Sequence, residues 1–135
     1  MKHILSIALF MLLAACSGTE SVKIAEQGVG QFHAELNAGH YAQLYEKSAS
    51  DMKAATKRDE FVAFLVGAHK KLGAFKSGKQ VGWNDNYATG GHFVTLQYES
   101  QFERGLAQEQ FVFRLKDDQS ILVGYQINSN LFVTG

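Results

Sequence analysis

The stretch HFVTLQYESQF, residues 92–102, decides the fold, because its apolar and polar side chains alternate. Successive side chains of a β-strand point to opposite faces, so this alternation is typical of a strand with one buried face. The apolar side chains that share one face are Val94, Leu96, Tyr98 and Phe102. The opposite face carries Thr95, Gln97 and Glu99. We therefore expect a long antiparallel strand that is buried on one side only.

The segments on both sides of this stretch predict three more strands. The preceding strand covers Phe75, Ser77, Lys79, Val81 and Trp83, and a loop over 84–91 follows it, with turn residues at 84–86 and 89–91. After a reversal at 104–105, the third strand contains Phe111, Phe113 and Leu115. After a turn over 116–119, the last strand contains Val123, Tyr125 and Ile127.

The residues before the sheet have helical periodicity. The first helix is predicted from Val22, with Ala25, Val29, Phe32 and Leu36 on one face and an end at 37–39. A second, short helix contains Tyr41, Leu44 and Tyr45, and the chain breaks at 48–50. The third helix begins after an N-cap at Thr56 and ends at Gly73. The sequence thus predicts an α+β fold with three N-terminal helices packed on one face of a four-stranded antiparallel sheet.

Composition limits the possible functions. The 135 residues suit one domain, and 46% of them are apolar, which is too many for a disordered chain. The 13 basic and 13 acidic side chains give a formal net charge of zero, so a dedicated nucleic-acid binder is not expected. The single cysteine excludes a disulfide framework and a multi-cysteine metal site.

The N-terminus is typical of a processed export signal. Lys2 precedes an apolar stretch from Ile4 to Leu13, which is too short to cross a bilayer that needs about twenty residues. Residues 13–16, Leu-Ala-Ala-Cys, resemble a bacterial lipobox. The alternative is an ordinary secretory signal with a chance cysteine.

The lipobox resemblance implies that residues 1–15 are removed and that Cys16 carries palmitate-type acyl chains in the membrane. Ser17 at the second mature position resembles the pattern of outer-membrane lipoproteins. We therefore expect a periplasm-facing protein with an acylated cysteine and short flexible tether at 16–21, and a single α+β domain at 22–135.

Three local segments indicate a family. Residues 36–41, 71–73 and 124–128 resemble small bacterial domains of unknown function in the cystatin-like, nuclear transport factor 2-like superfamily. The resemblance covers about residues 22–130 and implies that the helices lie across a strongly curved sheet and enclose a cone-shaped pocket. His40 stands where the first loop of that family often has aspartate.

Four side chains on the predicted sheet are candidates for a ligand pocket: Trp83, His92, Tyr98 and Tyr125. His92 is also a candidate acid–base residue because histidine titrates near neutral pH. Asp85 is the nearest carboxylate in sequence, in the predicted loop. The other mature histidines, His33, His40 and His69, lack further converging ligands, so solvated or capping roles are expected and neither a metal nor a cofactor is predicted.

These features predict a non-enzymatic, lipid-anchored binding or accessory module for a protein or a small apolar ligand. The alternative is a small acid–base enzyme of the isomerase or dehydratase type, with His92 as base and Tyr98 as hydrogen-bond donor. A third interpretation, compatible with either, is a homodimer formed through the open sheet face. The polar residues available for that contact are Gln97, Glu99, Gln108, Gln110 and Arg114.

Overall fold

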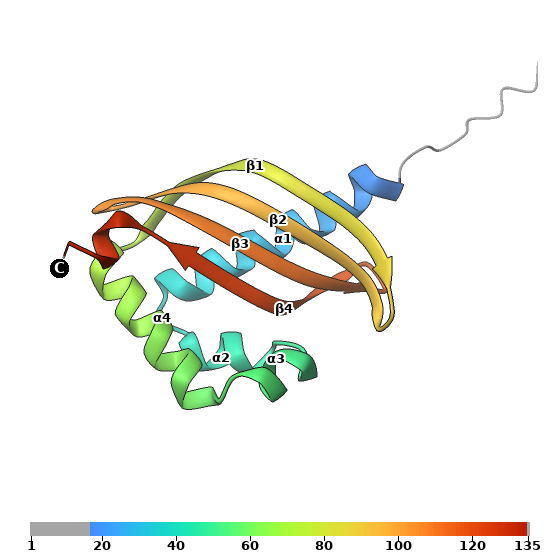
Figure 1. Ribbon diagram of the computed structural model, residues 1–135, viewed down its shortest axis with the longest axis horizontal. Coiled ribbons are helices and arrows are strands. Elements are labelled where there is room, and N and C mark those ends of the chain that lie inside the picture. The colour runs from blue at the N-terminus through green and yellow to red at the C-terminus, as the bar shows by residue number, and fades with distance from the viewer. Residues whose placement is uncertain (1–16, 135) are drawn as a thin grey trace, which may run out of the picture.

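Four helices precede an antiparallel sheet in the computed structural model, which describes residues 17–134 (Figure 1). The helices are α1 (Ser17–Asn37), α2 (Tyr41–Glu46), α3 (Ser50–Ala55) and α4 (Arg58–Leu72). The strands are β1 (Phe75–Ala88), β2 (Gly91–Phe102), β3 (Gly105–Lys116) and β4 (Gln119–Asn128), followed by a 3₁₀ turn, η1 (Asn130–Phe132). The sheet has the order β1-β2-β3-β4, so the predicted α+β class and the four-stranded meander are confirmed.

The alternation in β2 gives the buried face that the sequence predicts. Val94 and Leu96 are fully buried, and they pair with Phe113 and Phe111 of β3, which are buried too. The turn between β3 and β4 consists of Asp117 and Asp118, which both have positive φ. Two such residues form the tight turn whose twist matches that of a hairpin.

Helix α1 covers this apolar face and contacts all four strands. The Phe32 ring lies 5.1 Å from Phe111 and 4.4 Å from Tyr125 between ring centroids. In Figure 1, α1 crosses behind the curved sheet, so the opposite face of the sheet is not covered by this helix. We call that opposite face the open face.

Helices α2, α3 and α4 gather beside β4 (Figure 1). The backbone N–H of Ala49 donates to the Leu122 carbonyl at 2.8 Å, which fixes the segment before α3 to the edge of the sheet. At the other end of this layer, Gly73 ends α4 with φ of 76°. The left-handed region suits glycine, and the predicted end of this helix is confirmed.

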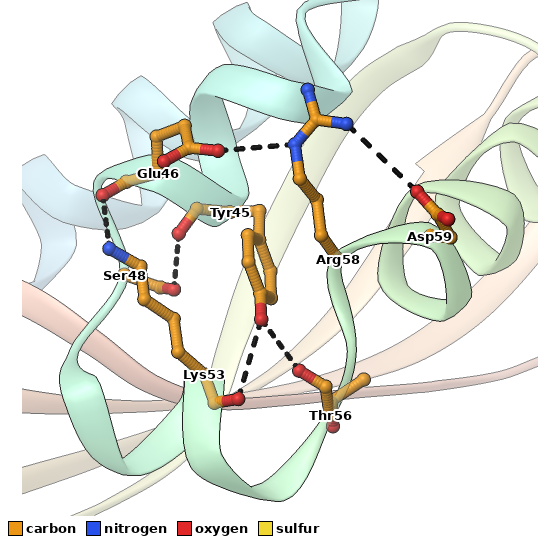
Figure 2. A network of polar contacts seen from close by, with 7 residues as sticks. All are labelled: Tyr45, Glu46, Ser48, Lys53, Thr56, Arg58 and Asp59. Carbon is orange, nitrogen blue, oxygen red and sulfur yellow. Dashed lines mark hydrogen bonds and ion pairs between the residues drawn. The ribbon is translucent and has the colours of Figure 1, made fainter.

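Polar contacts join α2 to the segments after it (Figure 2). The Tyr45 hydroxyl donates to the Thr56 carbonyl at 2.8 Å, and Arg58 Nε contacts a Glu46 carboxylate oxygen at 3.1 Å. The start of α4 is therefore tied directly to α2.

Two helix predictions are wrong. Residues 17–21, expected to be part of a flexible tether, form the first turns of α1, where Ser21 and Val22 are buried by packing against the domain. The chain also forms one more helix than predicted, because α3 lies between the break and α4. Thr56 is the C-cap that follows the last residue of that extra helix, Ala55, and the N-cap of α4 is Lys57.

One strand prediction also needs correction, and β4 contains an irregularity that the sequence does not predict. Residues 84–88, expected in a loop, continue β1, because Asn84 pairs with Thr95 and Asn86 with Phe93 of β2. In β4, Leu122 is buried and its neighbour Val123 is only half-buried. The reason is an irregularity in register between Val112 and Phe113, which places Leu122 opposite Phe113.

The described helices do not include one that is long and apolar enough to cross a membrane.

Candidate functional site

Carboxamide side chains line the centre of the open face. Gln97 of β2 pairs with Gln110 of β3, which pairs with Gln126 of β4, and Gln108 pairs with Asn128. Directly paired residues of antiparallel strands project from the same face. Gln108 and Gln110 are two residues apart on β3 and also project from one face, so these five side chains share the face opposite α1. Gln97 Nε2 donates to Gln110 Oε1 at 3.3 Å, which links the row across two strands.

A cavity of about 550 Å³ lies over this row and reaches all four strands. We call it the open-face cavity. Its walls include Phe64 of α4, which is 46% exposed, and Val81 of β1. Glu109 and Tyr125 also line it, but their side chains bond groups on the α1 side, so their backbone forms part of the cavity floor.

The chemistry of this surface is mixed and nearly uncharged. Among the described residues that line the cavity, only Glu109 carries a formal charge, and its carboxylate is turned toward α1. Each carboxamide offers one acceptor oxygen and two N–H donors. A ligand that covered them without hydrogen bonds would cost about 1–3 kcal/mol for each unsatisfied group. The surface therefore favours a ligand with its own polar groups over a small apolar ligand, which is one of the two classes of ligand that the sequence predicts.

An ion pair holds α3 against the open face. Arg114 of β3 donates from Nη1 and Nη2 to the two carboxylate oxygens of Asp51, at 2.9 and 2.5 Å. Its Nε donates to the Gly90 carbonyl at 2.9 Å, and the guanidinium lies 5.2 Å from the Phe93 ring centroid. The hydrogen bonds from Arg114 lower the pKa of the Asp51 carboxyl. This bidentate geometry positions α3 beside the cavity.

A buried carboxylate lies on the α1 side of the cavity floor. Glu109 is 2% exposed, and its Oε1 accepts hydrogen bonds from His33 Nε2 at 2.7 Å and Ser100 Oγ at 2.6 Å. Its Oε2 accepts one from the Tyr125 hydroxyl at 2.5 Å. Three donors satisfy this charge inside the protein, so the cluster is suited to holding α1 on the sheet rather than to binding a ligand.

The sequence does not predict this cluster. His33 was expected to be solvated or capping, and that is wrong: it is 4% exposed, stacked on Phe75 with 3.5 Å between ring centroids. The signal for Glu109 was an acidic residue at a position of the third strand where the alternation requires an apolar one. Its main partner, His33, lies 76 residues away in sequence, which no local pattern reveals.

The tyrosines near this carboxylate are held in their neutral form. Burial, together with the negative charge of Glu109 and the hydrogen bond to it, raises the pKa of Tyr125 well above its usual value of 10. Burial, followed by the charges of Glu26 and Glu109, raises the pKa of Tyr98 to about 12. Neither hydroxyl is therefore suited to give up its proton near neutral pH.

His92 belongs to a second polar group, at the other end of the sheet. Its Nε2 donates to Asp85 Oδ1 at 2.5 Å, and its ring stacks on Tyr87 with 4.0 Å between centroids. Asp85 was expected in a loop, but it lies in β1, and Tyr87 pairs directly with His92. A cavity of about 290 Å³ between the start of α1 and the β3–β4 turn is lined by both rings.

The structure does not bring the four predicted pocket residues together. Tyr98 and Tyr125 line the floor of the open-face cavity, and His92 lines the smaller one. Trp83 of β1 is 57% exposed and lines neither of these two cavities. Cys16, the predicted lipidation site, lies outside the described residues.

The two remaining histidines each contact one polar side chain. His40 Nδ1 contacts Glu35 at 3.0 Å, and His69 Nδ1 contacts the Tyr41 hydroxyl at 2.6 Å. Within residues 17–134, the structure contains no group of three or more His, Cys, Asp or Glu side chains placed to hold a metal ion.

Comparison with known proteins identifies the family of the domain. A family model described as "Protein of unknown function (DUF4019)" matches residues 29–125, which extend from the middle of α1 into β4. The chain belongs to the DUF4019 family. The DUF4019 match includes Phe64, Gln97 and Gln110 of the open-face cavity and both His92 and Asp85. No curated protein matches the chain.

Proposed function

We propose that this protein is a lipid-anchored module of the bacterial envelope that binds a ligand or partner on its open face without catalysing a reaction. The observation that carries the proposal is the open-face cavity, which offers five carboxamides and an exposed aromatic ring. An acid–base group is not among its accessible side chains in the described part of the chain. Shape and hydrogen bonding are therefore the properties that this surface can use.

The anchor is part of the proposal. Acyl chains on Cys16 would hold the domain on the periplasmic side of the outer membrane, as the lipobox-like residues 13–16 and Ser17 suggest. Each buried methylene contributes about 0.8 kcal/mol, and stable anchoring needs more than one chain. Labelling cells with a palmitate analogue tests this: the wild-type protein should be labelled and Cys16→Ser should not. Label on Cys16→Ser would contradict the assignment.

We also propose the superfamily to which this fold belongs. A long helix laid across a curved, four-stranded antiparallel meander supports membership of the cystatin-like, nuclear transport factor 2-like superfamily. The ligand site proposed here lies on the open face, on the side of the sheet away from α1.

Native mass spectrometry of the acylated protein, purified from its own host, tests the binding role. We expect a reproducible adduct that disappears in Phe64→Ala. Val66→Ala is the matched control, because Val66 is a similarly exposed apolar residue of α4 that does not line the cavity. An adduct lost equally in both variants would place the ligand elsewhere.

The His92–Asp85 pair supports a second candidate, acid–base catalysis of the isomerase or dehydratase type. The carboxylate orients the imidazole in the wall of a cavity, as a general base requires. Tyr98, the hydrogen-bond donor expected from the sequence, does not line that cavity. Solvent deuterium exchange into a panel of enolisable carbonyl compounds tests the idea: exchange should be lost in His92→Ala with the melting temperature retained. Equal exchange by wild type and His92→Ala would exclude it.

A further inference from the structure

The open-face cavity has the chemical features of a site for an uncharged, hydroxyl-rich ligand. From its lining we propose that it binds a neutral oligosaccharide lying across the strands. This inference rests on the proposed binding function and specifies its ligand class.

The accessible lining of the cavity is uncharged. The accessible side chains of the cavity are carboxamides and apolar groups, and the carboxylate of Glu109 has both oxygens occupied on the α1 side. An anionic ligand would find no cation in this lining, and a cationic ligand would find no free anion. A neutral ligand leaves no charge unpaired in the complex.

The carboxamides of the cavity suit a ligand that carries many hydroxyl groups. A row of five carboxamides presents donors and acceptors side by side, and a sugar hydroxyl both donates and accepts. The Gln97–Gln110 hydrogen bond orients one amide from each of two strands. Beside the amides the surface is apolar, because Phe64 of α4 and Val81 of β1 also line the cavity. Sugar rings carry C–H faces as well as hydroxyl rims, and this surface offers a complement to both.

The length of the cavity favours a ligand of several sugar residues. The cavity extends from Val81 on β1 to Gln126 on β4, which spans three inter-strand spacings of about 4.8 Å, or roughly 14 Å. That distance is longer than one sugar ring, so a chain of several residues fits better than a monosaccharide. An extended peptide is the weaker alternative, because peptides usually join a sheet at its edge through backbone hydrogen bonds. The lining groups here lie on a face.

Calorimetric titration of the full acylated protein tests the inference, in a zwitterionic detergent that has no sugar headgroup. The probes are maltotetraose and chitotetraose, with tetragalacturonate as an anionic control. We expect saturable binding of at least one neutral tetrasaccharide and none of tetragalacturonate. Gln110→Ala and Phe64→Ala should each raise the dissociation constant by about tenfold, whereas Val66→Ala should leave it unchanged. Unchanged melting temperatures would show that the variants are folded.

The outcomes separate this inference from the proposed function. If native mass spectrometry shows a Phe64-dependent adduct but neither neutral tetrasaccharide binds, the saccharide assignment is overturned and the binding module stands. If neither experiment detects a ligand, both fail. Binding that is equally strong in wild type, Gln110→Ala and Phe64→Ala would place the saccharide outside the cavity and overturn the inference.

Discussion

Two glycines of α1, two residues apart, should respond to the same substitution with opposite signs. A Cβ on Gly28 would meet Ser120 Oγ and would lie 2.9 Å from Cε1 of Phe113, whereas a Cβ on Gly30 would meet nothing within 4 Å. The serine hydroxyl can rotate away, but the Phe113 ring is buried and stacked on Phe111. Helix α1 thus approaches the sheet so closely at Gly28 that the position has no room for a methyl group.

The magnitudes follow from two competing effects. Replacing glycine by alanine inside a helix gains up to about 1 kcal/mol from backbone entropy. Forcing an extra carbon into a packed core costs about 1–3 kcal/mol. Gly30→Ala should therefore raise the free energy of unfolding by up to about 1 kcal/mol. Gly28→Ala should lower it by as much as about 2 kcal/mol after the helical gain is subtracted.

Urea denaturation of both variants, followed by circular dichroism, measures the difference. A gap of about 1–3 kcal/mol, with Gly28→Ala the less stable, is expected. Equal stabilisation of the two variants would refute the close approach of α1 to Phe113. The matched pair is informative because both substitutions have the same intrinsic helix propensity, so the difference reports on packing alone.

Other predictions concern the buried carboxylate, pH, α3 and assembly. Tyr125→Phe removes a hydrogen bond to the charged Glu109 and should cost about 1.5–3 kcal/mol in unfolding free energy; a change below about 0.5 kcal/mol would show that the bond contributes little. Because the pKa of Tyr98 is raised to about 12 in the folded state, the unfolded state ionises first, so stability should be lost as pH rises from 10 through 12. Tyr98→Phe should reduce this loss in denaturation curves recorded at several alkaline pH values. Arg114→Ala removes the ion pair with Asp51 and should speed amide hydrogen exchange in α3 but not in β2, as mass spectrometry can measure. A homodimer through the open face would cover the cavity, so the binding role predicts a monomeric mass by light scattering at high protein concentration.

The predicted strand faces were confirmed where alternation alone determines them. In β2 the buried positions of Val94 and Leu96 follow from a period of two, which is a local property of the chain. The sequence predicts a loop at residues 84–86 because Asn and Asp favour turns, but the pairing of these residues with β2 overrides that preference. The sequence does not predict helix α3, because the helix is only six residues long and is held by contacts to β3 and β4 that leave no periodic pattern.

One part of the candidate site could be predicted from the sequence, and another part could not. The polar row of Gln97, Gln108 and Gln110 could be assigned to the open face from the sequence, and the register confirms that these residues share it. The cavity could not be predicted, because its wall at Phe64 depends on how α4 lies beside the sheet. The partnership of Glu109 with His33 depends on the packing of α1 across β3, which only the tertiary structure shows.

The early start of α1 has a mechanical consequence. The helix spans 21 residues, or roughly 30 Å at 1.5 Å per residue, and it begins at Ser17. At its far end, the Asn37 side chain donates to the Phe75 carbonyl at 3.0 Å and accepts from the Phe75 N–H at 2.8 Å. If Cys16 is acylated, a force on the lipid is transmitted along α1. The far end of this helix is hydrogen-bonded to Phe75, the first residue of β1. The force then reaches the sheet through a continuous helix, because residues 17–37 contain no unstructured segment that could absorb it.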